Sequence, residues 1–204
     1  MSVAQFIREP GSDIPAGSLV LEANQVLKGA EIGLLATVGR VDGVKVYRKP
    51  VIGLVSTGNE LVDASTKELE DGKIRDSNKI MLKSIIKEYQ IAEEVRDYGT
   101  VSDREESLHE AMQKATKECD IVVTSGGVSM GELDLVKPYV EKNGKVFFGR
   151  LNMKPGKPTT FGEINKALVF ALPGNPVSAF VTAHLFVVTA ARVLSGHMDS
   201  YDWQ

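Results

Sequence analysis

The chain has 204 residues, of which 43% are hydrophobic and 25% charged, so it is long enough to bury one substantial core. Its formal net charge of −3 argues against a nucleic-acid partner, because binding to phosphate backbones normally requires an excess of Lys and Arg. The single cysteine, Cys119, excludes a disulfide within the chain. No uninterrupted apolar run has the length of a membrane span. The composition predicts a cytoplasmic location and leaves a small anionic ligand open.

Residues 1–44 are rich in turn-forming Pro, Gly and Asp, with only short apolar stretches between them. A single helix is expected there, around residues 30–36. A helix of that length is not stable alone and must pack on something else. We expect this segment to be a short irregular appendage, the remnant of a preceding domain or linker.

From residue 45 to 204 apolar runs alternate with amphipathic stretches, which is typical of helices packed on a largely parallel sheet. Each such run predicts a strand. The runs are 51–55, 121–123, 146–153 and 168–172. We therefore predict a three-layer α/β/α domain over residues 45–204, whose sheet is mostly parallel, with room for one antiparallel edge strand.

Helical periodicity lies between the apolar runs. Asp76, Ser77 and Asn78 are capping candidates for a helix of about four turns. Residues 102–105 fit a capping box for a second helix, which leads to Cys119. A short helix is expected near residues 133–136. The last helix is predicted to carry one apolar stripe and to end at Ser195-Gly196. The stripe consists of Val177, Val181, His184, Val188 and Ala191.

Polar, glycine-rich loops follow three of the predicted strands, at residues 56–60, 125–132 and 173–175. Because the carboxyl ends of parallel strands meet at one edge of a sheet, we expect these loops to converge there. Successive N–H groups of Ser125, Gly126 and Gly127 can form a concave anion site, which suits a phosphate. The P-loop and the dinucleotide-binding fingerprint are both absent, so those two nucleotide-binding classes are disfavoured.

Five segments resemble, in chain order, the molybdopterin molybdenumtransferase family, which includes the E domain of gephyrin. They are Ser56–Leu61, Ile74–Asn78, Thr124–Asp134, Met153–Pro158 and Leu172–Ala179. The segment Glu31–Gly39 is similar to the family's stretch before its pterin-binding domain. The resemblance covers nearly the whole chain and identifies it as a chain truncated to the family's central pterin-binding domain. Many relatives carry Asp where this chain has Asn59, so any negative charge that this position supplies is absent here.

The resemblance implies a transferase that ligates molybdate to the dithiolene of adenylylated molybdopterin and releases AMP, assisted by Mg²⁺. It also implies a homodimer, and protein partners if the chain is gephyrin-like. Two alternatives stay open, a non-catalytic scaffold and the related domain that adenylylates molybdopterin. The Lys154–Pro158 loop and the Glu31–Gly39 segment favour the insertion branch. Whether this short chain is active alone also stays open.

The resemblance assigns residues to the site in three groups. The catalytic group is Asp76, Glu132 and Asp134, of which Asp76 and Glu132 are expected to hold a hard cation through their oxygens. The group for pterin and phosphate is Thr57, Gly58, Asn59, Ser77, Ser125, Gly126, Gly127, Ser129, Pro173, Gly174, Asn175 and Ser178. The group for molybdate is Lys154, Pro155, Lys157 and Pro158, two cations on a loop stiffened by proline.

Each of these assignments has a structural alternative. Asp76 is also a good helix cap in any protein. Glu132 and Asp134 also suit the first turn of a helix, where acids complement the helix dipole. Lys154 and Lys157 would ordinarily be solvated surface charges. The two glycines of the second loop also suit a tight turn alone.

Overall fold

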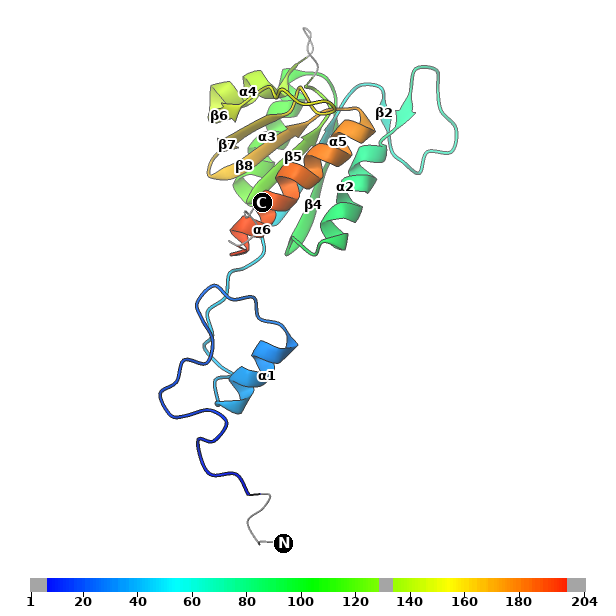
Figure 1. The fold of residues 1–204 in the computed structure, drawn as a ribbon. Helices are drawn as coiled ribbons and strands as arrows, with labels where there is room; N and C mark the ends of the chain where they lie inside the picture. Colours follow the sequence, from blue (N-terminus) through cyan, green and yellow to red (C-terminus); the bar gives the residue numbers. More distant parts are fainter. Residues whose placement is uncertain (1–6, 129–133, 198–204) are drawn as a thin grey trace. The chain divides into compact units, whose positions relative to one another are not determined.

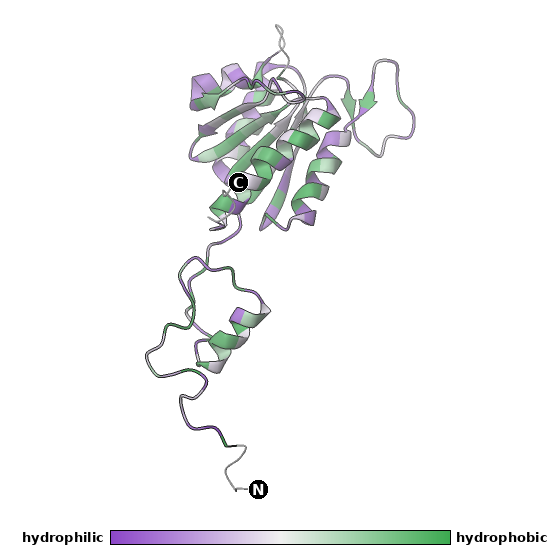
Figure 2. Ribbon diagram, viewed as in Figure 1, coloured by the Kyte–Doolittle hydropathy of each residue, from purple (hydrophilic) through white to green (hydrophobic). Residues whose placement is uncertain are grey.

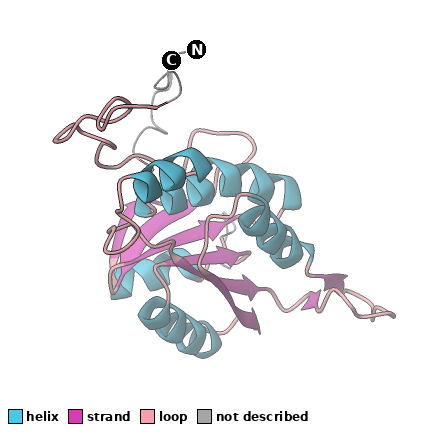
Figure 3. Ribbon diagram, turned by 90° about the horizontal axis from the view of Figure 1, so that it is seen from below, coloured by secondary structure: helices cyan, strands magenta, loops and turns pink. Residues whose placement is uncertain are grey.

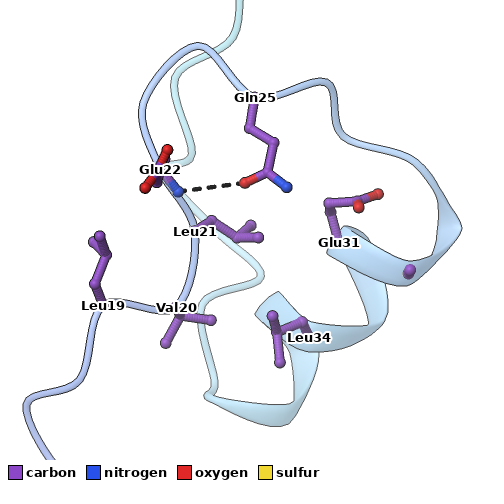
Figure 4. Close-up of a pocket in the computed structure, with 8 residues that line it drawn as sticks. Leu19, Val20, Leu21, Glu22, Gln25, Glu31 and Leu34 are labelled. Carbon is purple, nitrogen blue, oxygen red and sulfur yellow. Dashed lines mark hydrogen bonds between the residues drawn. The ribbon is translucent and has the colours of Figure 1, made fainter.

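The computed structural model describes residues 7–128 and 134–197, and the chain forms two compact units, Met1–Val46 and Tyr47–Gln204. In the first unit, α1 (Gly29–Thr37) confirms the helix expected near residues 30–36. The Glu31 carboxylate accepts a hydrogen bond of 2.8 Å from the Lys28 N–H and so caps this helix. Residues 19–22 and Gln25 face α1 across a pocket (Figure 4). None of residues 7–46 is buried, so the unit has no core of its own in the part described.

The second unit is built on a six-stranded sheet in the order β4-β1-β5-β8-β7-β6 (Figure 1). The four strands β4, β1, β5 and β8 are parallel, and β7 is antiparallel to both of its neighbours. The antiparallel strand therefore lies one position inside the edge strand β6. The strand bounds are β1 (Val51–Thr57), β4 (Glu94–Val101), β5 (Ile121–Ser125), β6 (Lys145–Phe148), β7 (Thr160–Ile164) and β8 (Ala167–Leu172). A separate parallel pair joins β2 (Leu61–Val62) to β3 (Ile74–Arg75).

Helices cover both faces of this sheet (Figures 1 and 3). One face carries α2 and the run α5–η1–α6, and the other carries α3 and α4. The helix bounds are α2 (Ser77–Glu88), α3 (Glu105–Glu118), α4 (Val136–Asn143), α5 (Pro176–Thr182), the π-helical η1 (Ala183–Val188) and α6 (Thr189–Leu194). The predicted three-layer α/β/α fold with a mostly parallel sheet is confirmed.

The central strands are apolar along their whole length because both of their faces are buried. Along β1, Ile52 and Leu54 pack under α2 and α5, whereas Val55 packs under α3. The three residues Ile121, Val122 and Val123 of β5 are fully buried. Figure 2 shows apolar strands between helices whose outer faces are polar. The two cores hold the carboxyl ends of β1, β5 and β8 at fixed positions.

Two local predictions were wrong. The predicted capping box at residues 102–105 does not form, because the helix N-cap is Arg104, which makes no side-chain capping bond. The Ser102 hydroxyl instead bonds that of Ser107, at 2.9 Å. The strand predicted over 146–153 ends at Phe148, and the chain continues as an irregular loop to Thr159.

The predicted apolar stripe of the last helix was also partly wrong. Val177 is 63% exposed, and the buried positions include Ala179, Ala183 and Val187. The cause is η1, whose wider π-helical turns shift the face that meets the sheet. By length and composition alone the continuous helix Pro176–Leu194 is apolar enough to cross a membrane, although its apolar residues do not form one uninterrupted run. Here its apolar side is part of the core against α2 and the sheet.

Candidate functional site

Three loops converge at the carboxyl ends of β1, β5 and β8, at the upper edge of the sheet in Figure 1. The side-chain amide of Asn78, in the first turn of α2, donates to Ser125 Oγ at 2.7 Å and to the Gly174 carbonyl at 2.8 Å. The Gly126 N–H donates to the Leu172 carbonyl at 3.1 Å. These bonds join the loops after β5 and β8 to the start of α2.

The loops after β1 and β5 meet at the point in the sheet from which the two chain connections run to opposite sides. The connection from β1 leads through α2 to β4 on one side, and the connection from β5 leads through α4 to β6 on the other. In open α/β sheets this divergence opens a crevice outside the carboxyl ends of the two strands, where ligands bind. By this rule a ligand crevice is expected beside Thr57 and Ser125, the last residues of β1 and β5.

The turn after β5 requires glycine at two successive positions. Gly126 and Gly127 have φ angles of 88° and 64°, which side chains rarely adopt. A Cβ on Gly126 would lie 2.4 Å from the Thr57 carbonyl oxygen, and one on Gly127 would lie 2.6 Å from Thr57 Oγ1. The β5 loop therefore lies directly against the end of β1. Because the Gly126 N–H is already bonded to Leu172, the predicted anion site has one fewer free donor.

The polar residues of the other two loops are hydrogen-bonded within the protein. Asn175 is the N-cap of α5, and its Oδ1 accepts from the Ser178 N–H at 3.2 Å. Asn59 and Asp103 exchange two bonds, since each backbone N–H donates to the other's side chain, at 3.0 and 3.2 Å. Both pairs shape the loops beside the crevice.

The remaining residues of the predicted pterin group vary in exposure. Thr57 and Pro173 are buried, whereas Ser77 and Gly174 are exposed. Ser129 lies outside the described residues, and so does Glu132 of the catalytic group.

The two described acids of the predicted catalytic group lie at helix starts. Asp76 is only 4% exposed. Its carboxylate accepts from the Lys79 N–H at 3.1 Å and lies 3.6 Å from Lys79 Nζ. Asp134 accepts from the Lys137 N–H at 3.2 Å, and burial raises the pKa of its carboxyl. Asp76 is thus a cap with a neighbouring cation, and Asp134 lies in a poorly solvated position.

The predicted magnesium pair is Asp76 with Glu132, and because Glu132 lies outside the described residues this pair stays a prediction. Residues 7–128 and 134–197 contain no group of three or more His, Cys, Asp or Glu placed to hold one metal ion. The lysine beside Asp76 also neutralises the charge that a cation would need. No step is assigned to Mg²⁺ on these residues.

Stability measurements should separate the capping role of Asp76 from any role of its charge. Asparagine caps helices about as well as aspartate, so Asp76→Asn is expected to stay within about 0.5 kcal/mol of the wild type, whereas Asp76→Ala should lose about 1–2 kcal/mol. Urea unfolding of both variants tests this, with the exposed Asp63→Asn as a control for charge removal. A loss as large in Asp76→Asn as in Asp76→Ala would show that the negative charge, and not the cap, is what matters.

The predicted molybdate loop is held rigidly and presents two exposed lysines, Lys154 and Lys157. The Leu151 N–H donates to the Lys157 carbonyl at 2.9 Å, which closes the loop at its base. The Gly156 carbonyl accepts from both the N–H and the hydroxyl of Thr159, at 3.1 and 2.7 Å. The Lys154–Pro155 bond is cis, and residues 152–158 line a pocket of their own. The lysine charges therefore lie on a fixed backbone.

The chain is thus a three-layer α/β domain whose polar loops converge at the carboxyl ends of its central parallel strands. Residues 53–192 match the family described as "probable molybdopterin binding domain", and the chain belongs to this family. It is 45% identical to gephyrin of Dictyostelium discoideum, over 94% of this chain and 30% of that protein. It is 41% identical to the molybdopterin molybdenumtransferase of Haemophilus influenzae, over 94% of this chain and 46% of that protein.

Solved structures agree with this relation. The molybdopterin biosynthesis moea protein of Pyrococcus horikosii superposes with a TM-score of 0.74 at 36% identity, covering 90% of this chain and 45% of the other. The family resemblance found in the sequence is therefore confirmed. The MoaB enzyme of a Thermus species is similar in fold alone, with a TM-score of 0.55 at 14% identity. The chain spans less than half the length of the first three of these proteins.

Proposed function

We propose that the chain binds molybdopterin, or its adenylylated form, in the crevice between the β1, β5 and β8 loops. In this proposal residues 45–204 form the pterin-binding part of a protein that ligates molybdate to the dithiolene and releases AMP. The observation that carries the proposal is the 41% identity over 94% of the chain to a molybdopterin molybdenumtransferase. The convergence of three polar loops at the ends of buried parallel strands supports it physically.

The side chains around the crevice suit such a ligand. Thr57 and Ser125 place hydroxyl groups at the ends of β1 and β5, and both residues are at least 95% buried. Hydroxyl groups both donate and accept hydrogen bonds, which matches the mixed edge of a pterin and the oxygens of its phosphate. Lys154 and Lys157 supply positive charge for the molybdate oxyanion.

The test of the proposal is binding, because the chain spans less than half the length of its curated relatives. Calorimetric titration of the full chain with molybdopterin, with and without Mg²⁺, is expected to show saturable binding at one site. Gly174→Phe should abolish this binding, because a Cβ there would lie 3.6 Å from the Gly126 Cα, in ordinary contact, and the ring would fill the crevice. Gly33→Phe, in α1, is the matched control, because no atom lies within 4 Å of its added Cβ.

Two outcomes would contradict the proposal. Absence of binding to the folded wild-type chain would favour a scaffold without a pterin site. Equal binding by the wild type and Gly174→Phe would place the ligand outside this crevice.

A further inference from the structure

Asn78 links three parts of the site, although the sequence suggests only that it helps to cap α2. Asn78 is 7% exposed, and its Nδ2 donates hydrogen bonds to both the Ser125 hydroxyl oxygen and the Gly174 carbonyl. A carbonyl oxygen only accepts hydrogen bonds, so the Gly174 contact fixes which end of the amide is nitrogen. The two N–H groups of one side chain therefore link residues that lie 47 and 96 positions away in the sequence.

This orientation determines the direction of the hydrogen bonds at the crevice. Ser125 Oγ accepts from Asn78, so the hydroxyl proton of Ser125 must point to a different acceptor. Asn78 Oδ1 is buried and has no hydrogen-bond partner among the residues that the structure describes. A buried acceptor without a partner is costly, so we expect a donor from outside the residues that the structure describes, such as a ligand or a water molecule.

We propose that Asn78 is a positioning residue for the ligand: it holds the β5 and β8 loops together and makes the Ser125 hydroxyl a hydrogen-bond donor to the ligand. Its own Oδ1 accepts from a ligand N–H or from a water bound with the ligand. The ligand that fits carries an acceptor, such as a carbonyl or phosphate oxygen, close to an N–H donor. The identity of that ligand rests on the proposed function. The link between the loops does not depend on it.

Asn78→Asp tests the link because it keeps the shape of the side chain and removes both N–H donors. At pH 7.5 the new carboxylate repels the Gly174 carbonyl and turns the Ser125 hydroxyl proton toward itself. Hydrogen exchange of the ligand-free chain should then be at least about tenfold faster at the Gly126 and Ser178 amides. Asn165→Asp is the matched control, because Asn165 also donates to a hydroxyl, that of Thr116, at 3.3 Å, in a different turn.

Molybdopterin binding supplies the second readout, which a general loss of structure would not reproduce. Asn78→Asp is expected to bind at least about tenfold more weakly than the wild type at pH 7.5. Binding should recover in part as the pH falls and the buried carboxyl is protonated, because its single O–H can then restore one of the two hydrogen bonds that the amide donates. The wild type and Asn165→Asp should show no such recovery.

The outcomes separate this inference from the proposed function. If the wild-type chain does not bind molybdopterin but Asn78→Asp still accelerates exchange at both amides, the proposed function fails and the link between the loops stands. If the wild type binds and Asn78→Asp matches it in exchange and in affinity at every pH, the positioning role is overturned. A weaker binding that stays the same at low pH would also overturn the assigned direction of the hydrogen bonds.

Discussion

Gly126→Ala is expected to lower the free energy of unfolding by about 2–5 kcal/mol and to abolish molybdopterin binding. Two effects add. An alanine at a φ of 88° is strained, and its Cβ would lie 2.4 Å from the backbone oxygen of Thr57. Since that oxygen belongs to β1, which is paired with β4 on one side and β5 on the other, it has little freedom to move. The β5 loop must therefore lift away from β1, which opens the crevice.

Gly72→Ala is the matched control for this substitution. Gly72 has a φ of 78°, but no atom lies within 4 Å of an added Cβ, so the variant shows the backbone strain without the steric overlap. Urea unfolding is expected to give a loss of about 1–2 kcal/mol for this control. Equal losses in the two variants would mean that the contact between the β5 loop and Thr57 contributes nothing.

The contrast between these glycines shows what the sequence reveals about the site and what it does not. Both are glycines in polar loops, and only the structure shows that Gly126 faces the end of a neighbouring strand. The sequence predicts Gly126 at this edge of the sheet because Gly126 follows a buried apolar run. That prediction requires only that the carboxyl ends of parallel strands meet at one edge of the sheet, so it does not depend on the conformation of the loop.

The three central strands that were predicted differ in burial from the edge strand β4, which was missed. β1, β5 and β8 are buried on both faces and read as continuous apolar runs. β4 is an edge strand whose charged residues form ion pairs, including Arg96 with Glu94 at 2.8 Å and Asp97 with Lys83 at 2.7 Å. Because an edge strand is only partly buried, β4 has no continuous apolar run, and its pattern of apolar residues does not distinguish it from a loop.

The role of Asn78 was missed for a different reason. In the sequence it stands beside Asp76 and Ser77 and reads as one of three capping candidates. Its partners, Ser125 and Gly174, belong to two other loops, and only the order of strands in the sheet brings them together. The sequence held one indication of this role: Asn78 stands at the start of a helix that is predicted to pack beside the first apolar run, and so lies near the carboxyl ends of the strands.

Removing both lysines of the rigid loop, in Lys154→Ala plus Lys157→Ala, is expected to weaken molybdate binding to the molybdopterin-loaded chain by about tenfold or more. The loss should shrink at high salt, because both side chains are exposed and their attraction for an oxyanion is screened. Affinity for molybdopterin itself should change by less than about twofold, since the lysines lie on a separate loop. Calorimetry with molybdate at low and high ionic strength measures these values.

The matched control is Lys117→Ala plus Lys142→Ala, which removes the same charge from the last turns of α3 and α4. If net charge alone attracts the oxyanion, both double variants should weaken molybdate binding equally. If the loop is the site, only the first should do so, because both of its lysines stand on one loop whose base is closed by the bond from Leu151 to Lys157. Unchanged molybdate binding in the first variant would remove the lysine loop from the site, while leaving the pterin crevice to be tested by Gly126→Ala.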